Sequence, residues 1–208
     1  MSKRIFITAT NTDIGKTYAS TLLLKEYASA GLKVGVFKPI ETGVETEPLD
    51  GTKLFNLAKE LNPTLSALSI NDIVPYQFLL PAAPYVAKEE TIIDLSYLEE
   101  KLQNIEKYCD IVIIEGAGGL MVPVEKNLFM VDFISIFKAS PLLVCPSRLG
   151  SINDTLLSRH LLESRNIPYV WAINLYADAD SFEQVTAPFY AKNFLSLQND
   201  IKEISNKL

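Results

Sequence analysis

The stretch RIFITATNTDIGKT, from Arg4 to Thr17, decides the fold of this chain. It passes from an apolar, β-rich run (residues 4–9) through a polar loop into Gly-Lys-Thr, which opens a helix over about residues 16–30 that ends at Gly31. A strand, a loop and a helix in this order form the context of a phosphate-binding loop (P-loop). Because the first backbone N–H groups of the helix and its dipole face the loop, the sequence predicts an anion site there.

Within this loop, Lys16 is expected to reach the β- and γ-phosphates of a nucleotide. The Thr17 hydroxyl is expected to bind Mg²⁺, which prefers a few oxygen ligands together with phosphate and water. The strict P-loop spacing has glycine where this chain has Thr10. The alternative is an ordinary strand–turn–helix with a surface Lys-Thr pair.

The rest of the chain alternates between strand-like and helix-like segments. Further strands are expected at residues 34–38, 111–115, 142–145 and 169–174, and further helices at 97–108, opened by a capping box of Ser96 and Glu99, and at 153–164. This pattern predicts an α/β fold, with a doubly wound, mostly parallel sheet in the three-layer αβα arrangement of P-loop NTPases. We expect one domain over residues 1–208, functional loops at 41–51 and 71–84, and a C-terminal dozen residues that fray.

Three more polar residues stand where predicted strands end. Lys38 ends one strand, Glu115 ends another just before a glycine-rich turn, and Asn174 ends a third. In an open α/β sheet, ligands collect outside the carboxyl ends of the strands, so these residues and Lys16 are expected to share one site. Taken singly, they are also compatible with a strand-end lysine, a solvated acid and a turn asparagine.

Composition excludes several other classes. The 208 residues carry 19 basic against 25 acidic side chains, a formal net charge of −6, which disfavours nucleic-acid and anionic-membrane partners. The longest apolar stretch is far shorter than a membrane span, and the N-terminus lacks a secretory apolar core, so a cytoplasmic protein is expected. Cys109 and Cys145 are expected to be buried, reduced thiols, since they form no CxxC pair and the chain has one histidine.

Five motifs together resemble the dethiobiotin synthetase family. They are TATNTDIGKT (8–17), KPIETG (38–43), IEGAGGLMVP (114–123), LGSIN (149–153) and AIN (172–174), in the family's order. The resemblance implies a homodimeric P-loop ligase that uses MgATP to join carbon dioxide to 7,8-diaminopelargonic acid. The products would be dethiobiotin, ADP and phosphate.

The same resemblance implies site residues. Catalytic roles fall to Lys16, Lys38 and Thr12, and magnesium ligands are Thr17, Asp50 and Glu115. Nucleotide contacts are implied for Asp13, Ile14, Gly15, Lys16, Thr17, Tyr18 and Asn174. Substrate contacts are implied for Thr12, Lys38, Thr42, Gly118, Leu149, Gly150 and Asn153, with the segment that contains the last three reaching the site from the partner subunit.

The chain also departs from this family. Ala9 stands where the loop usually begins with glycine, and the C-terminal loop that packs on the nucleotide base in many members has no clear counterpart, so the triphosphate preference stays open. The competing hypothesis is a P-loop switch ATPase of the partitioning or metal-carrier type. Those proteins resemble one another in an early second lysine of the loop, and this chain has Asn11 there.

Overall fold

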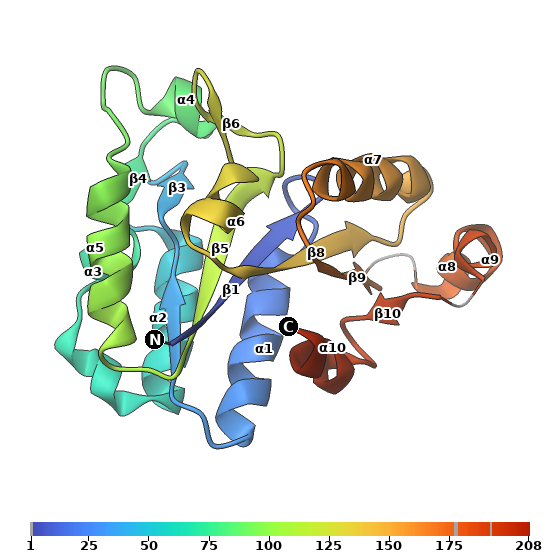
Figure 1. The fold of residues 1–208 in the computed structure, drawn as a ribbon, viewed down its shortest axis with the longest axis horizontal. Coiled ribbons are helices and arrows are strands. Elements are labelled where there is room, and N and C mark those ends of the chain that lie inside the picture. The colour runs from blue at the N-terminus through green and yellow to red at the C-terminus, as the bar shows by residue number, and fades with distance from the viewer. Residues whose placement is uncertain (1, 177–178, 192) are drawn as a thin grey trace.

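A central parallel sheet organises the computed structural model, which describes residues 2–176, 179–191 and 193–208 (Figure 1). In this described part the sheet has six strands in the order β10-β9-β8-β1-β5-β2, and neighbouring strands pair in parallel. Their bounds are β1 Lys3–Ala9, β2 Val34–Phe37, β5 Ile111–Gly119, β8 Ser140–Pro146, β9 Val170–Asn174 and β10 Leu195–Ser196. The predicted doubly wound α/β fold is therefore confirmed.

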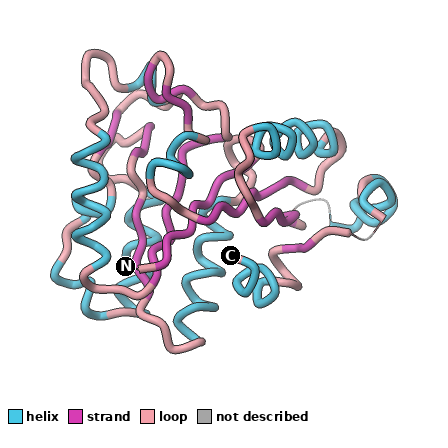
Figure 2. Tube along the Cα trace, in the orientation of Figure 1, coloured by secondary structure: helices cyan, strands magenta, loops and turns pink. Residues whose placement is uncertain are grey.

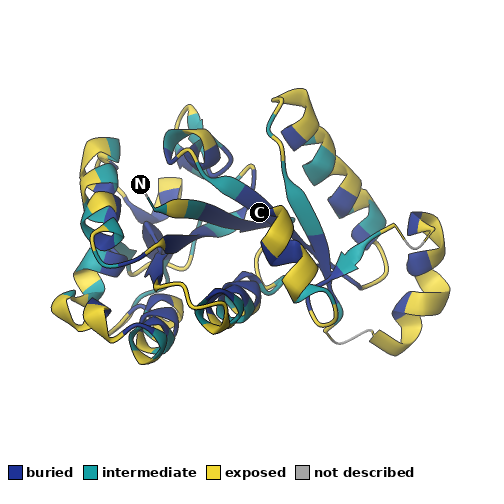
Figure 3. Cartoon of the chain, turned by 60° about the horizontal axis from the view of Figure 1, so that its bottom comes forward, coloured by how far each residue is buried: buried dark blue, intermediate teal, exposed yellow. Residues whose placement is uncertain are grey.

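Helices cover both faces of this sheet (Figure 2). Helices α1 (Lys16–Ser29), α2 (Leu49–Leu61) and α10 (Ile201–Lys207) lie on one face, where α1 packs against the other two. Figure 3 shows α5 (Leu95–Glu106), α6 (Asp132–Ile136) and α7 (Ser151–Ser164) on the other face. Helices α8 (Ala179–Val185) and α9 (Ala187–Tyr190) lie beyond β9, near β10 (Figure 1).

The core follows from burial of the central strands on both faces. Ile5, Phe6 and Ile7 of β1 are fully buried, because the sheet encloses them from the sides and helices cover them above and below. Cys109 and Cys145 are buried free thiols, as predicted, and burial raises the pKa of each to about 12. None of the helices in the described residues is long and apolar enough to cross a membrane.

The segments expected to be loops contain short regular elements. Strands β3 (Ile40–Thr42) and β4 (Tyr76–Phe78) form a small parallel sheet above the carboxyl end of the main one. Beside them lie α3 (Ile70–Ile73) and α4 (Pro84–Ala87), whereas a 3₁₀ helix (Pro63–Ala67) follows α2 at the opposite edge of the main sheet, where Asn62 donates to the Val34 and Tyr108 carbonyls. An antiparallel hairpin, β6 (Pro123–Glu125) with β7 (Leu128–Phe129), follows β5.

Two sequence predictions at helix ends are wrong. Helix α5 is capped by Asp94, whose carboxylate accepts from the N–H groups of Ser96 and Tyr97; the predicted partner Glu99 instead binds Arg4. The C-terminal residues do not fray, because α10 packs against α1 and the Tyr27 hydroxyl donates to the Ser205 carbonyl at 2.8 Å.

Candidate functional site

The loop after β1 presents the N-terminus of α1 to a cavity at the carboxyl edge of the sheet. Gly15 has φ +104°, and a Cβ there would lie 2.2 Å from the Asn174 side-chain nitrogen, so both its backbone and its surroundings require glycine. The first N–H groups of α1 lack helical acceptors, as at any helix start, and are free to bind an anion.

Lys16 lies in this loop, 8% exposed, and its Nζ donates to the Asn11 carbonyl at 3.3 Å. Burial lowers the pKa of Lys16 to about 8, against the attraction of the Glu115 carboxylate. An anion in the cavity would favour the charged ammonium, so this lysine is suited to binding phosphate.

The register between strands β2 and β5 places Lys38 beside Glu115. Strands β2 and β5 run in parallel with Phe37 opposite Ile114, so Lys38 follows beside Glu115. The Lys38 ammonium donates to Glu115 Oε1 at 2.7 Å, and both side chains are buried. Burial alone would lower the pKa of Lys38, but the Glu115 carboxylate raises it above its ordinary value. Lys38 is therefore a fixed cation beneath the cavity.

The Glu115 carboxylate also ties α1 to β5. It accepts from the Thr17 hydroxyl at 3.2 Å and from the Ser20 hydroxyl at 2.7 Å. In the described ranges no three His, Cys, Asp or Glu side chains gather as a metal site. One carboxylate with a neighbouring hydroxyl fits Mg²⁺, which takes its remaining oxygens from phosphate and water. Ser20 was not identified from the sequence.

Asp50 reaches the same edge from the start of α2. Its Oδ2 lies 3.9 Å from Lys38 Nζ, and its side chain is 51% exposed toward the cavity. Glu41, which the sequence analysis did not single out, accepts from the backbone N–H groups of Asp50 at 3.0 Å and Gly51 at 2.9 Å. Burial raises the pKa of Glu41, against the lowering effect of Lys38 and these two N–H groups.

A cavity of about 770 Å³ joins these groups. Most of the predicted site residues line it: Thr12, Asp13, Gly15, Lys16, Thr17, Lys38, Thr42, Asp50, Gly118 and Asn174. Glu115 lies buried directly beneath, bonded to Thr17 and Lys38. Ile14, Tyr18, Leu149, Gly150 and Asn153 are not among its lining residues. The geometry thus gathers the P-loop and strand-end residues but leaves the 149–153 segment outside.

The Asn174 amide already has partners at both ends. Its Nδ2 donates to the Ile14 carbonyl at 2.9 Å, and its Oδ1 accepts from Gln198 Nε2 at 2.7 Å. Gln198 also accepts from the Leu175 N–H at 3.1 Å. Asn174 therefore holds the P-loop backbone. Sequence reasoning missed Gln198 because its contact joins residues 24 apart across β10, a strand that was not predicted.

Comparison with known protein families and sequences agrees with this geometry. A family model described as an AAA domain matches residues 3–193. The chain is 48% identical over 196 residues to the ATP-dependent dethiobiotin synthetase BioD of a Sulfurovum species, covering 94% of this chain and 93% of that one. It is 35% identical to the protein of the same name from Wolinella succinogenes, with 99% and 98% covered.

Comparison with solved structures supports the fold. The MinD cell division protein of Aquifex aeolicus has a TM-score of 0.52 at 17% identity, covering 99% of this chain and 87% of that one. A plasmid partition protein from Borrelia burgdorferi has a TM-score of 0.56 at 14% identity, with 99% and 95% covered. At such identities the likeness shows a shared P-loop NTPase fold and nothing finer. By its sequence relatives, the chain belongs to the ATP-dependent dethiobiotin synthetase family.

Proposed function

We propose that the cavity binds MgATP and a diamine, and that the chain closes the ureido ring of dethiobiotin. The observation that carries this proposal is that Lys16 and Lys38 line one cavity while Glu115 lies buried beneath it, bonded to Lys38; contrary to the sequence prediction, Glu115 does not end its strand, because β5 continues to Gly119. One amine of 7,8-diaminopelargonic acid takes up carbon dioxide as a carbamate. The γ-phosphoryl group of ATP passes to a carbamate oxygen, and the second amine attacks the carbonyl. Phosphate leaves, giving dethiobiotin and ADP.

The chain contributes position and charge to this reaction. Phosphoryl transfer depends mainly on alignment and on neutralising charge, which a site of two lysines and helix N–H groups supplies. Lys16 would bind the transferring phosphoryl group, and Lys38 would neutralise charge on the carbamate. When bound, Mg²⁺ would neutralise charge on the phosphate oxygens, and Thr17, Glu115 and Asp50 offer the oxygens to hold it.

The diamine would bind beside Thr12, Thr42 and Gly118. All three residues line the cavity, and Gly118 has φ +63°. A Cβ on Gly118 would lie 2.7 Å from Val122 and 3.5 Å from the Thr12 hydroxyl. Both the positive φ and the neighbouring Val122 therefore require glycine at this point of the cavity lining. Asp13, Gly15 and Asn174, which line the same cavity, would hold the nucleotide.

Phosphate release with each reactant omitted tests the proposal. We expect release to require ATP, bicarbonate and 7,8-diaminopelargonic acid together. Lys16→Ala should abolish turnover while keeping the circular dichroism spectrum of the wild type. Turnover that ignores the diamine would contradict a synthetase and favour the switch ATPase instead. Asn11 in place of a second loop lysine argues against that alternative.

A homodimer would complete the substrate site. Leu149 is 80% exposed, and Leu156 and Leu157 on the neighbouring helix α7 are 43% and 63% exposed. Gly150 and Asn153 lie beside these leucines and outside the cavity of their own chain. A second copy seated on α7 would bury the leucines and bring the 149–153 segment to its partner's diamine.

Three further expectations stay predictions. They are a single domain over residues 1–208, a cytoplasmic location, and the lack of nucleic-acid or membrane partners. The first depends on the alternation of strands and helices, the second on the short apolar stretches and the N-terminal sequence, and the third on the net charge.

A further inference from the structure

Glu41 is a buried acid at the cavity whose bonds are all to another element. It lies in the middle of β3, 8% exposed, and its two carboxylate oxygens each accept one backbone N–H, from Asp50 at 3.0 Å and from Gly51 at 2.9 Å. These are the second and third residues of α2. A side chain nine and ten residues away in sequence from these two residues thus takes the place of a local helix cap.

Helix α2 needs this cap because its own sequence supplies none. Its N-cap position is Pro48, which has no side-chain acceptor for the N–H groups of the first turn. A carboxylate at this end is also favoured by the helix dipole. The position of the start of α2 is therefore set by Glu41.

The close approach of the two elements is built into Gly51. A Cβ at residue 51 would lie 2.2 Å from Val74 Cγ2 and 3.2 Å from Glu41 Oε2. Any larger residue would collide with Val74 at the end of α3 and would crowd the Glu41 carboxylate. Gly51 leaves the room for a close approach, and the Glu41 carboxylate accepts the Gly51 N–H, so both residues are needed for the contact between β3 and α2.

Two residues of the proposed site are sequence neighbours of the residues that form the contact between Glu41 and the start of α2. Thr42, the next residue of β3, lines the cavity, and Asp50 carries the carboxylate that lies 3.9 Å from the Lys38 ammonium. We propose that Glu41 is a positioning residue, which by capping α2 holds the Asp50 carboxylate 3.9 Å from the Lys38 ammonium, where it can serve as a metal ligand. The proposal depends on the proposed function, because it takes Asp50 as a magnesium ligand.

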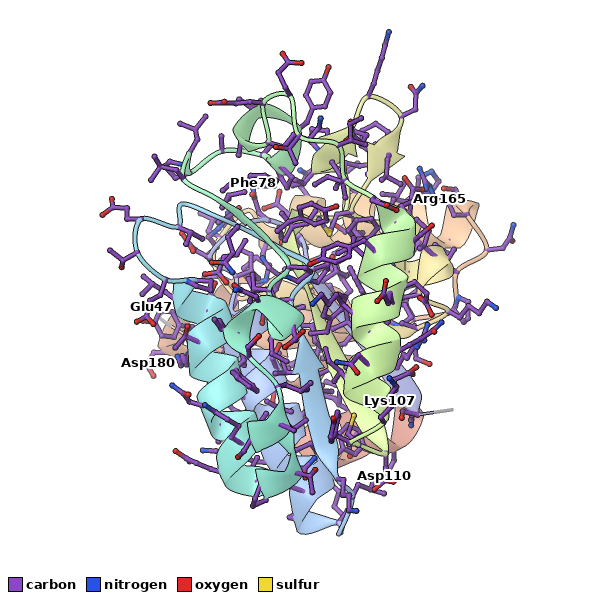
Figure 4. The ribbon with its side chains drawn as sticks, turned by 90° about the vertical axis from the view of Figure 1, so that its left-hand side faces the viewer. Glu47, Phe78, Lys107, Asp110, Arg165 and Asp180 are labelled. Carbon is purple, nitrogen blue, oxygen red and sulfur yellow. The ribbon has the colours of Figure 1, made fainter. Side chains whose placement is uncertain are left out.

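Three variants separate position from charge. Glu41→Gln keeps the length of the side chain, but its amide NH₂ replaces one carboxylate oxygen and cannot accept from the N–H group that faces it. Glu41→Asp keeps the negative charge near Lys38 but is one methylene too short to reach both N–H groups. Glu47→Gln is the matched control, since Glu47 is an exposed acid in the same loop before α2 (Figure 4).

The first readout needs neither metal nor substrate. Hydrogen exchange of the Asp50 and Gly51 amides should speed up roughly tenfold or more in Glu41→Gln and Glu41→Asp and stay unchanged in Glu47→Gln. The second is Mn²⁺ binding, by electron paramagnetic resonance, to the complex with a non-hydrolysable ATP analogue. Loss of a residue that orients a metal ligand should weaken it roughly tenfold to a hundredfold.

The third readout is a split in the kinetics. The Mg²⁺ concentration for half-maximal turnover should rise in both Glu41 variants, with a smaller rise in KM for ATP. Normal metal binding in Glu41→Asp beside weakened binding in Glu41→Gln would show a charge effect on Lys38 and overturn the proposal. Unchanged amide exchange in both variants would overturn it as well. If wild-type turnover ignores the diamine, the proposed function fails, while exchange and Mn²⁺ binding still test Glu41.

Discussion

The Lys38 ammonium and the Glu115 carboxylate stabilise each other in an interior that excludes water. Removing the cation leaves a buried carboxylate with only the Thr17 and Ser20 hydroxyls. We expect Lys38→Met to lower the free energy of unfolding by about 3–5 kcal/mol, the usual cost of breaking a buried ion pair. Urea denaturation followed by circular dichroism measures this.

The double variant Lys38→Met/Glu115→Gln separates structure from chemistry. It removes the uncompensated charge, so most of the lost stability should return, while diamine-dependent phosphate release should not. Stability that stays low in the double variant would mean that packing, rather than charge, makes Lys38 important.

The two buried cysteines should be unreactive in the folded protein. Burial raises the pKa of Cys109 and of Cys145 to about 12, so the reactive thiolate is scarce at pH 8. We expect iodoacetamide to leave both residues unmodified in the folded protein and to modify both in guanidinium. Mass spectrometry counts the adducts, and rapid labelling of the native protein would show that the core opens around these two residues.

At the scale of elements, helix α1 is bounded by two glycines with positive φ, and they make a matched pair. Gly15 has φ +104° and lies against Asn174, whereas Gly31 has φ +85° with nothing within 4 Å of the Cβ position. Gly31→Ala should lower the free energy of unfolding by about 1 kcal/mol from backbone strain alone. Gly15→Ala should also displace the P-loop and weaken ATP binding by about tenfold or more, a loss of at least about 1.4 kcal/mol.

Calorimetric titration with a non-hydrolysable ATP analogue distinguishes the two. Gly31→Ala is expected to bind the analogue as the wild type does. Adding Asn174→Ala to Gly15→Ala removes the clash but also the amide that holds the Ile14 carbonyl, so full recovery of binding would show that Asn174 does not position the loop.

Helices α3 and α5 are joined by one ion pair whose pH dependence is set by Asp72. Its carboxylate accepts from Lys101 Nζ at 2.8 Å and from the Ser69 N–H and hydroxyl. Although burial opposes it, these bonds lower the pKa of Asp72 to about 2, below the unfolded value of about 4. The stabilisation is therefore complete above pH 4 and is lost as the pH falls through 2.

We expect Asp72→Asn to lower the free energy of unfolding by about 1 kcal/mol at pH 7. The difference from the wild type should shrink between pH 4 and pH 2. Urea melts of both proteins across this range measure it, with Lys101→Met as the partner variant of a double-mutant cycle. A gap that is the same at pH 2 and pH 7 would refute the assigned pKa.

The elements that could be predicted from sequence are those whose cause is local. Strands such as β1 are continuous apolar runs, and the gathering of Lys16, Lys38 and Glu115 followed from the rule that ligands collect at the carboxyl edge of parallel strands. The predicted strand end at Glu115 is wrong, because β5 continues to Gly119. The start of α2 could not be predicted, because its cap is Glu41 in another element. Gln198 was missed for the same reason, since an amide contact across the sheet leaves no pattern in a single sequence.

At the scale of the whole molecule, the cavity and the 149–153 segment lie apart in one chain, so a dimer predicts a shared site. Lys16→Ala would disable the P-loop, and Asn153→Ala would disable the segment given to the partner. A mixed dimer contains one chain of each variant. One of its two sites has the altered P-loop and the altered 149–153 segment, and the other has an intact P-loop and an intact segment. We therefore expect each variant alone to be inactive or nearly so, and an equal mixture to recover about a quarter of wild-type turnover.

We expect turnover to recover only when the two variants exchange subunits and form mixed dimers. Light scattering should give the mass of two chains for the wild type, and of one chain for Leu157→Asp, which places a charge among the exposed leucines of α7. That monomer should bind ATP normally but need far more diamine for turnover, since its P-loop is complete and its substrate segment has no partner. Mixed dimers that form without recovering activity would place the whole diamine site within one chain.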